Sequence, residues 1–272
     1  MKTMPKVAYY GEPGSYSEQA AMQYFGSFAA LKGFRFLAQV FESVDDGMDY
    51  GVVPIENSIE GPVTQTYDLL LESNLTITGE EIVKIEHCLI SNPGVNLGDV
   101  ANVYSHPQAL GQCRKYLEGR RLNAIPFYDT AGSVKMLREK KLKDSAAIAS
   151  RRAAKAYGMK VLAQGIQSSK NNFTRFMVVA KQNNTKKWNK TSIAFEGKDR
   201  PGSLFHALNC FAKNKVNLLH IASRPIPGMP WEYNFYVDCE GSMLDGNISK
   251  AIRELHDAAD FVKILGSYRS AR

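Results

Sequence analysis

The feature that most constrains the fold is a change of rhythm near residue 181. Up to that point, short β-branched runs alternate with amphipathic stretches of helical periodicity, which is the pattern of an α/β domain. The polar segment 181–187 lacks apolar periodicity and is predicted to be an interdomain linker. The remainder predicts the order strand, helix, strand, strand, helix, strand, which is the ferredoxin-like (βαββαβ) arrangement.

The expected elements of the first domain follow from this periodicity. We expect strands at Lys6–Tyr10, Tyr50–Val53, Asn102–Tyr104, Ala124–Tyr128, Ser145–Ala149 and Phe173–Ala180. We expect helices at Glu18–Phe25, Gln65–Glu72, Pro107–Leu117, Ala131–Lys141 and Arg151–Tyr157. Pro107 suits a first helical position, and Gly119 and Gly158 suit positions just past a helix end. In the second domain we expect strands at 191–196, 216–223, 231–239 and 262–267, and helices at 202–213 and 247–258.

Charge and cysteine content exclude several classes of protein. The 272 residues carry a net charge of +7, which makes nucleic acid a candidate partner. The basic residues form separate clusters and no nucleic-acid-binding module is recognisable, so we expect a small polyanion instead. The four cysteines are scattered, which argues against a metal site or disulfides and favours a reducing compartment. With no signal-peptide pattern and no apolar run long enough to cross a bilayer, we expect a cytoplasmic protein without membrane contact.

The run Asn172-Phe173-Thr174-Arg175-Phe176 places a hydroxyl, a fixed cation and two aromatic rings at the entrance to an apolar β-run. An arginine there is costly without an anionic partner, and a ligand that bears a carboxylate would supply one. The alternative is an edge strand with one surface arginine.

Small polar groups also occupy four predicted strand-to-helix junctions, at 11–18, 54–63, 105–113 and 128–131. In open α/β sheets, such junctions line the crevice in which ligands bind. In the first junction, Ser15 and Glu18 have the spacing of a capping box, which would leave neighbouring backbone N–H groups available to an anion. The alternative is a simple capped turn.

The second junction contains two candidate donors to a carboxylate, Asn57 and Ser58, and Gly61 would allow the backbone to approach closely. Glu56 is an awkward neighbour for an anion, so we expect it to form a salt bridge or to orient another group. A purely structural turn capped by Asn57 is the alternative.

The third and fourth junctions offer further positioning groups. Pro107 starts a predicted helix, Ser105 or His106 stands at its cap, and Gln112 lies further along it. We assign no base role to His106, because a lone histidine in such a turn is more often a hydrogen-bonded cap than a catalyst. Asp129 has the position of a helix N-cap.

Together, the segments 11–17, 54–63, 105–113, 129–131, 145–150 and 172–176 resemble the prephenate dehydratase family in order and spacing. The Thr-Arg-Phe and Ser-His-Pro-Gln motifs are quite specific, and the resemblance covers nearly the whole chain. It implies an α/β catalytic domain over 5–181 with two lobes similar to a periplasmic binding protein and the site in the cleft between them. No chorismate mutase segment precedes Lys6, so the single-function form is expected.

The resemblance also implies roles for individual residues. Thr174 would serve the leaving hydroxyl of prephenate, and Arg175 would clamp a carboxylate. The implied substrate-positioning residues are Asn57, Ser58, Ser105, Gln112, Asp129 and Phe176. Since threonine is a weak acid, a water or another group could supply the proton while Thr174 holds the oxygen. The reaction, which gives phenylpyruvate in phenylalanine synthesis, requires no metal or organic cofactor.

The second domain, over 190–272, resembles the ACT module, which binds amino acids at subunit interfaces. Its helix start at 199–204 matches that family's turn, although Ser203 and Phe205 depart from the commonest form and Ala222 stands where glutamate is usual. The resemblance implies a homodimer or homotetramer with L-phenylalanine as effector. The implied effector contacts are Gly202, Ser203, Leu204, Asn217, Leu218, Ser223 and Arg224. The alternative is an ACT domain that only joins subunits.

Two other functions fit the same motifs. Arogenate dehydratase carries out the same elimination on the amino-acid analogue of prephenate, and the motifs do not separate the two substrates. A non-catalytic sensor of amino acids or carboxylates is the other alternative, although a pure sensor would not need Thr174 beside Arg175.

Overall fold

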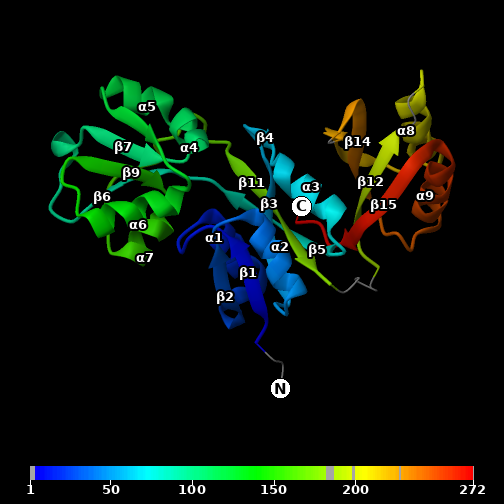
Figure 1. The fold of residues 1–272 in the computed structure, drawn as a ribbon, viewed down its shortest axis with the longest axis horizontal. Helices are drawn as coiled ribbons and strands as arrows, with labels where there is room; N and C mark the ends of the chain where they lie inside the picture. The colour runs from blue at the N-terminus through cyan, green and yellow to red at the C-terminus, as the bar shows by residue number, and fades with distance from the viewer. Residues whose placement is uncertain (1–3, 182–186, 198–199, 227, 272) are drawn as a thin grey trace. The chain divides into compact units, whose positions relative to one another are not determined.

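The computed structural model describes residues 4–181, 187–197, 200–226 and 228–271. Most of the predicted linker, residues 182–186, and Asp199 of the predicted helix start lie outside the described residues. The chain packs as two compact units (Figure 1). Unit 1 comprises Met1–Gly61 and Glu81–Phe176, and unit 2 comprises Pro62–Glu80 and Met177–Arg272.

The first sheet has the strand order β2-β1-β3-β11-β5, with the short β4 paired to β3. Its strands are β1 (Lys6–Tyr10), β2 (Ala30–Phe34), β3 (Tyr50–Asn57), β4 (Gly61–Pro62), β5 (Thr76–Lys84) and β11 (Phe173–Ala180). β1 runs parallel to both β2 and β3. The accompanying helices are α1 (Tyr16–Phe25) and α2 (Leu37–Asp45), with a 3₁₀ turn at Gly26–Phe28. The polar run that begins at Asn172 therefore enters this sheet beside β3.

The second sheet of unit 1 has the order β10-β6-β9-β7-β8. Its strands are β6 (Cys88–Ser91), β7 (Asn102–Ser105), β8 (Asn123–Pro126), β9 (Ser145–Ala149) and β10 (Lys160–Gln164). Its helices are α4 (Pro107–Gln112), α5 (Arg114–Gly119), α6 (Thr130–Lys140) and α7 (Arg151–Tyr157), with a 3₁₀ turn at Leu97–Asp99. Every residue of the central strand β9 is buried. Alternate residues of a strand face opposite ways, so Ile148 packs in a cluster with α4 and α5 residues, and Ala147 in one with α6 and α7 residues.

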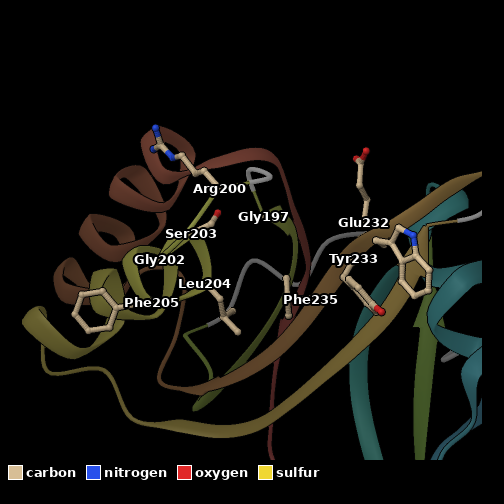
Figure 2. Close-up of a pocket in the computed structure, with 10 residues that line it drawn as sticks. Gly197, Arg200, Gly202, Ser203, Leu204, Phe205, Glu232, Tyr233 and Phe235 are labelled. Atoms are coloured by element: carbon tan, nitrogen blue, oxygen red, sulfur yellow. The ribbon is translucent and has the colours of Figure 1, made fainter.

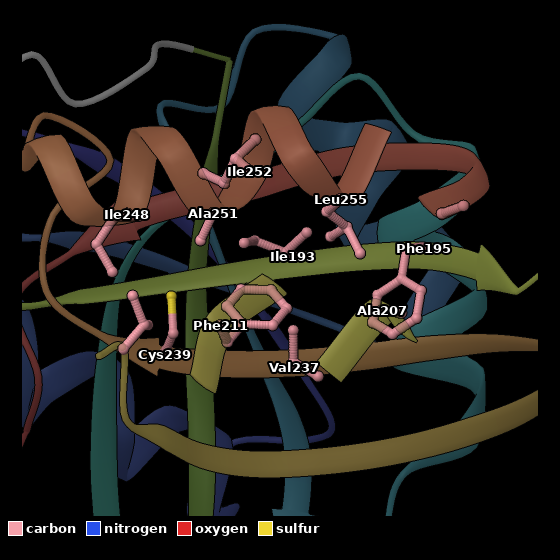
Figure 3. Packing of buried hydrophobic residues seen from close by; sticks show 12 residues of the cluster. Ile193, Phe195, Ala207, Phe211, Val237, Cys239, Ile248, Ala251, Ile252 and Leu255 are labelled. Atoms are coloured by element: carbon pink, nitrogen blue, oxygen red, sulfur yellow. The ribbon is translucent and has the colours of Figure 1, made fainter. Parts of the chain in front are cut away.

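Unit 2 contains an antiparallel sheet of order β13-β14-β12-β15. Its strands are β12 (Lys190–Gly197), β13 (Leu218–Ile226), β14 (Met229–Glu240) and β15 (Ala259–Tyr268), and its helices are α8 (Ser203–Lys213) and α9 (Gly246–Ala258). Figure 3 shows Phe195 and Ile193 of the sheet packed with Phe211 of α8 and Leu255 of α9. Burying this apolar face against two amphipathic helices supplies the main stabilisation of the βαββαβ fold.

Helix α3 (Thr64–Glu72) belongs to the same unit, although it lies early in the sequence. The Tyr236 hydroxyl of β14 donates to the Tyr67 carbonyl at 3.2 Å. The Lys263 ammonium of β15 donates to the carbonyls of Leu70 and Leu71 at 3.0 and 2.7 Å, so a cation covers the negative end of the α3 dipole. The α3 residues and the strand residues that they contact are thus 169 to 193 positions apart in the chain.

The predicted βαββαβ order is confirmed, and so are the expected elements of the first domain, with two differences. The helix expected over Pro107–Leu117 is divided at Cys113 into α4 and α5. Gly119 is the last residue of α5 and does not lie beyond its end, whereas α7 ends at Gly158 in the left-handed conformation. Elements β2, α2, β5, β6 and β10 were not predicted. β2 and β5 carry lysine, glycine or glutamate within the strand, which hides their periodicity.

No helix among the described residues is long and apolar enough to span a membrane.

Candidate active site

Asn57 organises the candidate site at the end of β3. Its side chain is buried, and its Oδ1 accepts from the backbone N–H groups of Ile59 and Glu60, both at 3.0 Å. The turn capped by Asn57, which was the alternative interpretation of the sequence, is therefore present. The other end of the same amide, Nδ2, donates to Thr174 Oγ1 at 3.0 Å and to Asn172 Oδ1 at 2.8 Å. Asn57 thus joins its own turn to the start of β11.

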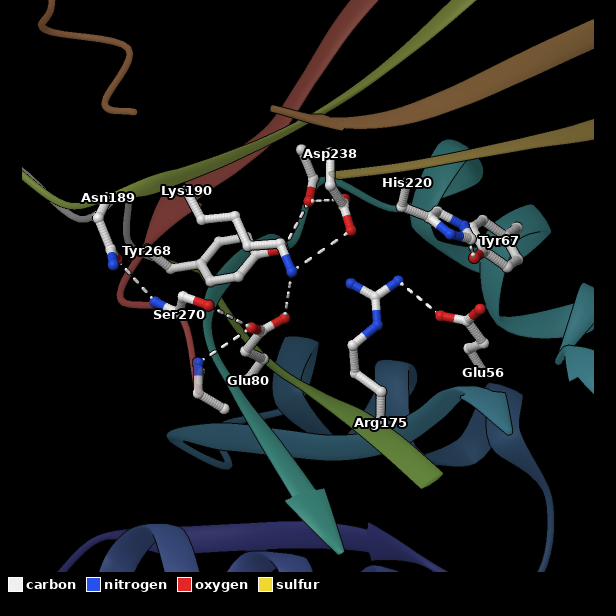
Figure 4. Close-up of polar contacts among 12 residues, drawn as sticks. Glu56, Tyr67, Glu80, Arg175, Asn189, Lys190, His220, Asp238, Tyr268 and Ser270 are labelled. Carbon is white, nitrogen blue, oxygen red and sulfur yellow. Dashed lines mark hydrogen bonds and ion pairs between the residues drawn. The ribbon is translucent and has the colours of Figure 1, made fainter. Parts of the chain in front are cut away.

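Arg175 lies next to Thr174 and forms an ion pair with Glu56, with 3.2 Å between Nη2 and Oε2 (Figure 4). The Arg175 side chain is 11% exposed and that of Glu56 is 33% exposed. The salt bridge expected of Glu56 is therefore present. A guanidinium has five N–H donors in a planar fork, a geometry that suits the binding of carboxylates.

Ser58 lies at the surface and binds the backbone before β11. Its hydroxyl accepts from the N–H of Phe173 at 3.0 Å and contacts the Asn171 carbonyl at 3.3 Å. The Ser58 N–H also donates to the Phe173 carbonyl at 2.8 Å. These bonds hold the entrance of β11 against the 54–63 junction, so Ser58 fixes the approach to Thr174.

Two predicted substrate contacts are enclosed in the protein. The Ser105 side chain is 0% exposed, and its hydroxyl donates to the Ile148 carbonyl at 2.6 Å, which ties β7 to β9. Phe176 is 2% exposed and belongs to the core, since it points to the opposite face of β11 from Arg175. Both side chains therefore have structural contacts here, and their substrate roles stay predictions.

Gln112 at the end of α4 lies beside the start of β11. Its Oε1 accepts from Asn172 Nδ2 at 2.7 Å, and its Nε2 is 3.5 Å from Glu60 Oε1. His106 is the N-cap of α4 and accepts from the Gln108 N–H at 3.3 Å, as expected of a histidine in such a turn. The predicted positioning residues Asn57 and Gln112 are therefore connected through Asn172, which sequence reasoning did not single out.

Asp129 caps helix α6 by accepting from the Gly132 N–H at 2.7 Å. Burial raises the pKa of the Asp129 carboxyl, and this effect outweighs the lowering of the pKa by the Gly132 N–H bond. The nearby Glu12 carboxylate raises the pKa further. The N-cap role left open by the sequence is thus observed.

The junction at 11–18 is a closed turn. Glu18 Oε2 accepts from the Gly14 N–H at 2.9 Å, and the Ser15 N–H donates to the Glu12 carbonyl at 3.0 Å. Ser15 Oγ accepts from the Glu18 N–H at 3.2 Å. The expectation of backbone N–H groups available to an anion is therefore wrong for Gly14 and Ser15, and the capped turn is the correct alternative.

Comparisons with known proteins decide the family. A family model described as prephenate dehydratase matches residues 7–184, and a model described as ACT domain matches residues 191–257. The chain belongs to the prephenate dehydratase family. The fold of its relatives agrees, because a solved prephenate dehydratase from Arthrobacter aurescens, in complex with L-Phe, has a TM-score of 0.89 at 32% identity. That similarity covers 98% of this chain and 90% of the other.

Two curated relatives match nearly the whole length of this chain. The chloroplastic arogenate dehydratase/prephenate dehydratase 2 of Arabidopsis thaliana is 42% identical over 97% of this chain and 72% of its own length. The bifunctional chorismate mutase/prephenate dehydratase of Aquifex aeolicus is 41% identical over 98% of this chain and 74% of its own length. The chain is thus similar to relatives named for either substrate.

The ACT domain of this prephenate dehydratase family member holds a pocket of about 280 Å³ at the start of α8 (Figure 2). Three of the predicted effector residues, Gly202, Ser203 and Leu204, line it. The Ser203 hydroxyl is buried and has no hydrogen-bond partner among the described residues. A buried hydroxyl without a hydrogen bond lowers the stability of the folded protein. A ligand with a polar group could form the missing hydrogen bond here.

The other predicted effector residues lie outside the pocket lining. Asn217 donates to Glu240 Oε2 at 3.2 Å, and Leu218 packs against the ACT core. Ser223 pairs with the pocket residue Phe235 across the β13–β14 ladder, so their side chains share a face of the sheet. Arg224 points to the opposite face of the sheet, where its guanidinium binds the Asp68 carboxylate, and its effector role stays a prediction.

Aromatic and charged groups form much of the remaining lining. Trp231, Glu232, Tyr233 and Phe235 of β14 contribute together with Arg200. The sequence could have indicated them, because Trp231, Tyr233 and Phe235 occupy alternate positions of a predicted strand and so share one face.

Proposed function

We propose that the chain catalyses the decarboxylating dehydration of prephenate to phenylpyruvate. The observation that carries this proposal is the Thr174 hydroxyl held at 3.0 Å by the Asn57 amide, with Arg175 as the next residue of β11. A hydroxyl group and a fixed cation at adjacent positions match a substrate that must lose hydroxide while its carboxylate is held.

The chemistry requires one proton and no oxidant. The bond from the ring to its carboxylate breaks and releases CO₂, and its electron pair makes the ring aromatic as the C–O bond on the far side breaks. The departing hydroxide takes a proton and leaves as water. Thr174 stabilises the developing charge on this oxygen, and the proton comes from its hydroxyl or from a water, with Thr174 restored from solvent.

The other residues of the candidate site would hold the substrate in place. Arg175 would hold the carboxylate that the product retains, in an ion pair shared with Glu56. Asn57, Ser58 and Gln112 would fix the strand entrance against which the substrate lies, and Asp129 would hold the start of α6. Small displacements of such groups lower the rate strongly, because the reacting atoms must stay aligned.

Arogenate dehydratase activity is the second candidate, and the 42% identity to a relative named for both substrates favours it. Purified protein should be given prephenate and arogenate in separate reactions, with phenylpyruvate and phenylalanine followed as products. Phenylpyruvate from prephenate supports the first proposal, and phenylalanine from arogenate alone supports the second. Turnover of neither substrate would leave the sensor as the function.

For regulation, we propose that L-phenylalanine binds the α8 pocket of the ACT domain. The solved relative in complex with L-Phe supports the ligand, and the apolar lining from Leu204 and Phe235 suits a benzyl group. The Glu232 carboxylate and the Arg200 guanidinium supply groups for an ammonium and a carboxylate. Calorimetric titration with L-phenylalanine tests this, and Ser203→Ala is expected to weaken binding.

The oligomeric state is proposed on the basis of the family resemblance, and the cellular location is predicted from the sequence. We propose a homodimer or homotetramer joined through ACT domains, which light scattering of the purified protein distinguishes from a monomer. A cytoplasmic location remains a prediction, and fractionation of cells that express the protein tests it.

A further inference from the structure

A buried chain of side-chain hydrogen bonds runs from the candidate catalytic residue to a histidine that the reaction does not use. It passes from Thr174 through Asn57 and Asn172 to Gln112, and ends at His87. Asn172 is 0% exposed and His87 is 2% exposed. Neither residue is a substrate contact in the proposal above, so their burial beside the site calls for a function.

We propose that Asn172 and His87 are positioning residues that fix the direction of this chain, so that Thr174 accepts a hydrogen bond from Asn57 and keeps its own proton for the leaving oxygen. This inference rests on the proposed dehydratase function. It assigns the direction of each bond and thereby a donor role to Thr174.

The direction is set at one end by backbone groups. The two N–H groups of Ile59 and Glu60 can only donate, so the Asn57 atom that faces them is its oxygen. The opposite end of the amide must then be the NH₂ group. It lies 2.8 Å from an Asn172 atom, 3.0 Å from Thr174 Oγ1 and 3.2 Å from the Phe173 carbonyl oxygen, so Asn172 and Thr174 are the nearest acceptors for its two hydrogens.

The same direction passes through the next two amides. Asn172 must present its oxygen to Asn57, so its NH₂ group faces Gln112 at 2.7 Å. Gln112 must therefore present its oxygen to Asn172. This orientation leaves the Gln112 NH₂ group toward the carboxylate of Glu60 at 3.5 Å, and a carboxylate can only accept.

His87 completes the chain. Its Nε2 lies 2.9 Å from the Gln112 oxygen that already accepts from Asn172, so Nε2 must carry a hydrogen. Burial lowers the pKa of His87, which favours a neutral ring with a single N–H. The ring is held edge-on to Tyr16, with centroids 5.9 Å apart. The Tyr16 hydroxyl donates to the Glu86 carbonyl at 2.7 Å and lies 3.4 Å from His87 Nδ1, a longer contact than the 2.9 Å between Nε2 and Gln112.

This hydrogen-bond direction determines what the Thr174 hydroxyl can donate. A hydroxyl that accepts a hydrogen bond becomes a better donor, because bonds in a chain polarise one another. If Asn57 were turned around, its oxygen would take the Thr174 proton instead, and the hydroxyl could then act on the substrate only as an acceptor. The two Asn57 orientations thus differ in whether a proton is available to the leaving group.

The first test uses Asn172→Asp, which retains the shape and the oxygen toward Asn57 but replaces the donor toward Gln112 by a second oxygen. Relative to wild type, kcat should fall at least tenfold at pH 8 and recover several-fold at pH 5, because protonation of the buried carboxyl restores a donor. KM should change less than kcat. The role of Asn172 would be overturned if the variant had the wild-type kcat at pH 8. It would also be overturned if the ratio of variant to wild-type kcat were equally low at pH 8 and at pH 5.

The second test concerns His87. We expect His87→Gln, whose side-chain NH₂ group can replace Nε2–H, to retain most of kcat, whereas His87→Leu should lose at least tenfold with little change in KM. Equal kcat values for the two variants would exclude His87 from the chain. In the wild-type protein, ¹⁵N NMR shifts should show the Nε2–H tautomer of His87, and the Nδ1–H tautomer would refute the assigned direction.

These tests are distinct from the test of function. If wild-type protein turns over neither prephenate nor arogenate, the proposed function fails and the NMR measurement still decides the hydrogen-bond direction. If wild type is active, each variant is judged by kcat after circular dichroism and thermal melting have shown that it folds.

Discussion

The guanidinium of Arg224 holds the carboxylate of Asp68 in a two-point ion pair, with Nε–Oδ1 at 3.1 Å and Nη2–Oδ2 at 2.6 Å. Asp68 lies on α3, and Arg224 lies on β13 of the ACT sheet. Ala222 pairs with Tyr236, whose hydroxyl donates to the Tyr67 carbonyl of α3. Ala222 thus faces α3, on the side of the sheet away from the α8 pocket.

We expect Asp68→Asn to lower the free energy of unfolding by about 1 kcal/mol, since the pair is bidentate but each side chain remains partly exposed. A double-mutant cycle with Arg224→Met, measured by urea unfolding, isolates the pair. Disruption of the exposed pair of Arg114 and Glu118 should have a smaller effect. A coupling no larger than that of the exposed pair would contradict the prediction.

We expect Thr174→Ala to reduce kcat about 100-fold or more, with a smaller change in KM, because its hydroxyl acts mainly as the C–O bond breaks. Steady-state kinetics with prephenate measure both constants. Thr174→Ser retains a hydroxyl at the same place and should retain most of kcat. Unchanged turnover in the alanine variant would remove Thr174 from the mechanism.

For Arg175, the expected result differs, since its cation binds the substrate before and during the reaction. Arg175→Ala should lower kcat and raise KM together. Arg175→Lys keeps the charge but loses the planar donor pair, so kcat/KM should still fall about 10- to 100-fold. Full activity of the lysine variant would show that charge alone suffices.

Gly14 illustrates a steric requirement of unit 1. A Cβ added there would lie 2.4 Å from Ala153 Cα, at a φ of +87°. We expect Gly14→Ala to destabilise the protein by about 3 kcal/mol. Gly158 is the matched control, because it has a φ of +64° and open space around it, so Gly158→Ala should cost about 1 kcal/mol. Equal melting temperatures of the two variants would contradict this account.

The raised pKa of Asp129 predicts a pH dependence of stability. The folded protein retains the Asp129 proton to higher pH than the unfolded chain, whose carboxyl has the ordinary pKa of an aspartate. This group therefore favours folding at low pH, and that contribution is lost as pH rises through the folded pKa. Asp129→Asn keeps an N-cap but does not titrate, so the stability of wild type relative to this variant should fall as pH rises from 3 to 7, measured by urea unfolding. A constant difference would contradict the prediction.

Local sequence chemistry indicated many residues of the candidate site. Thr174, Arg175 and Asn57 were identifiable because a hydroxyl, a cation and an amide beside apolar strands are unusual enough to indicate a ligand. Glu56 was expected to form a salt bridge because a carboxylate near an anion site needs a cation. Asn172 and His87 were not identified, since their function depends on partners 60 and 25 positions away in the chain.

The sequence by itself determined the order of elements, the βαββαβ domain and the residues that we propose for catalysis, because periodicity, capping and side-chain functional groups are local properties. Tertiary structure alone decided that Ser105 and Phe176 are enclosed, that Arg224 binds Asp68, and that α3 packs with the ACT domain. Burial and hydrogen-bond direction depend on which distant segments come together, and no short stretch of sequence contains that information.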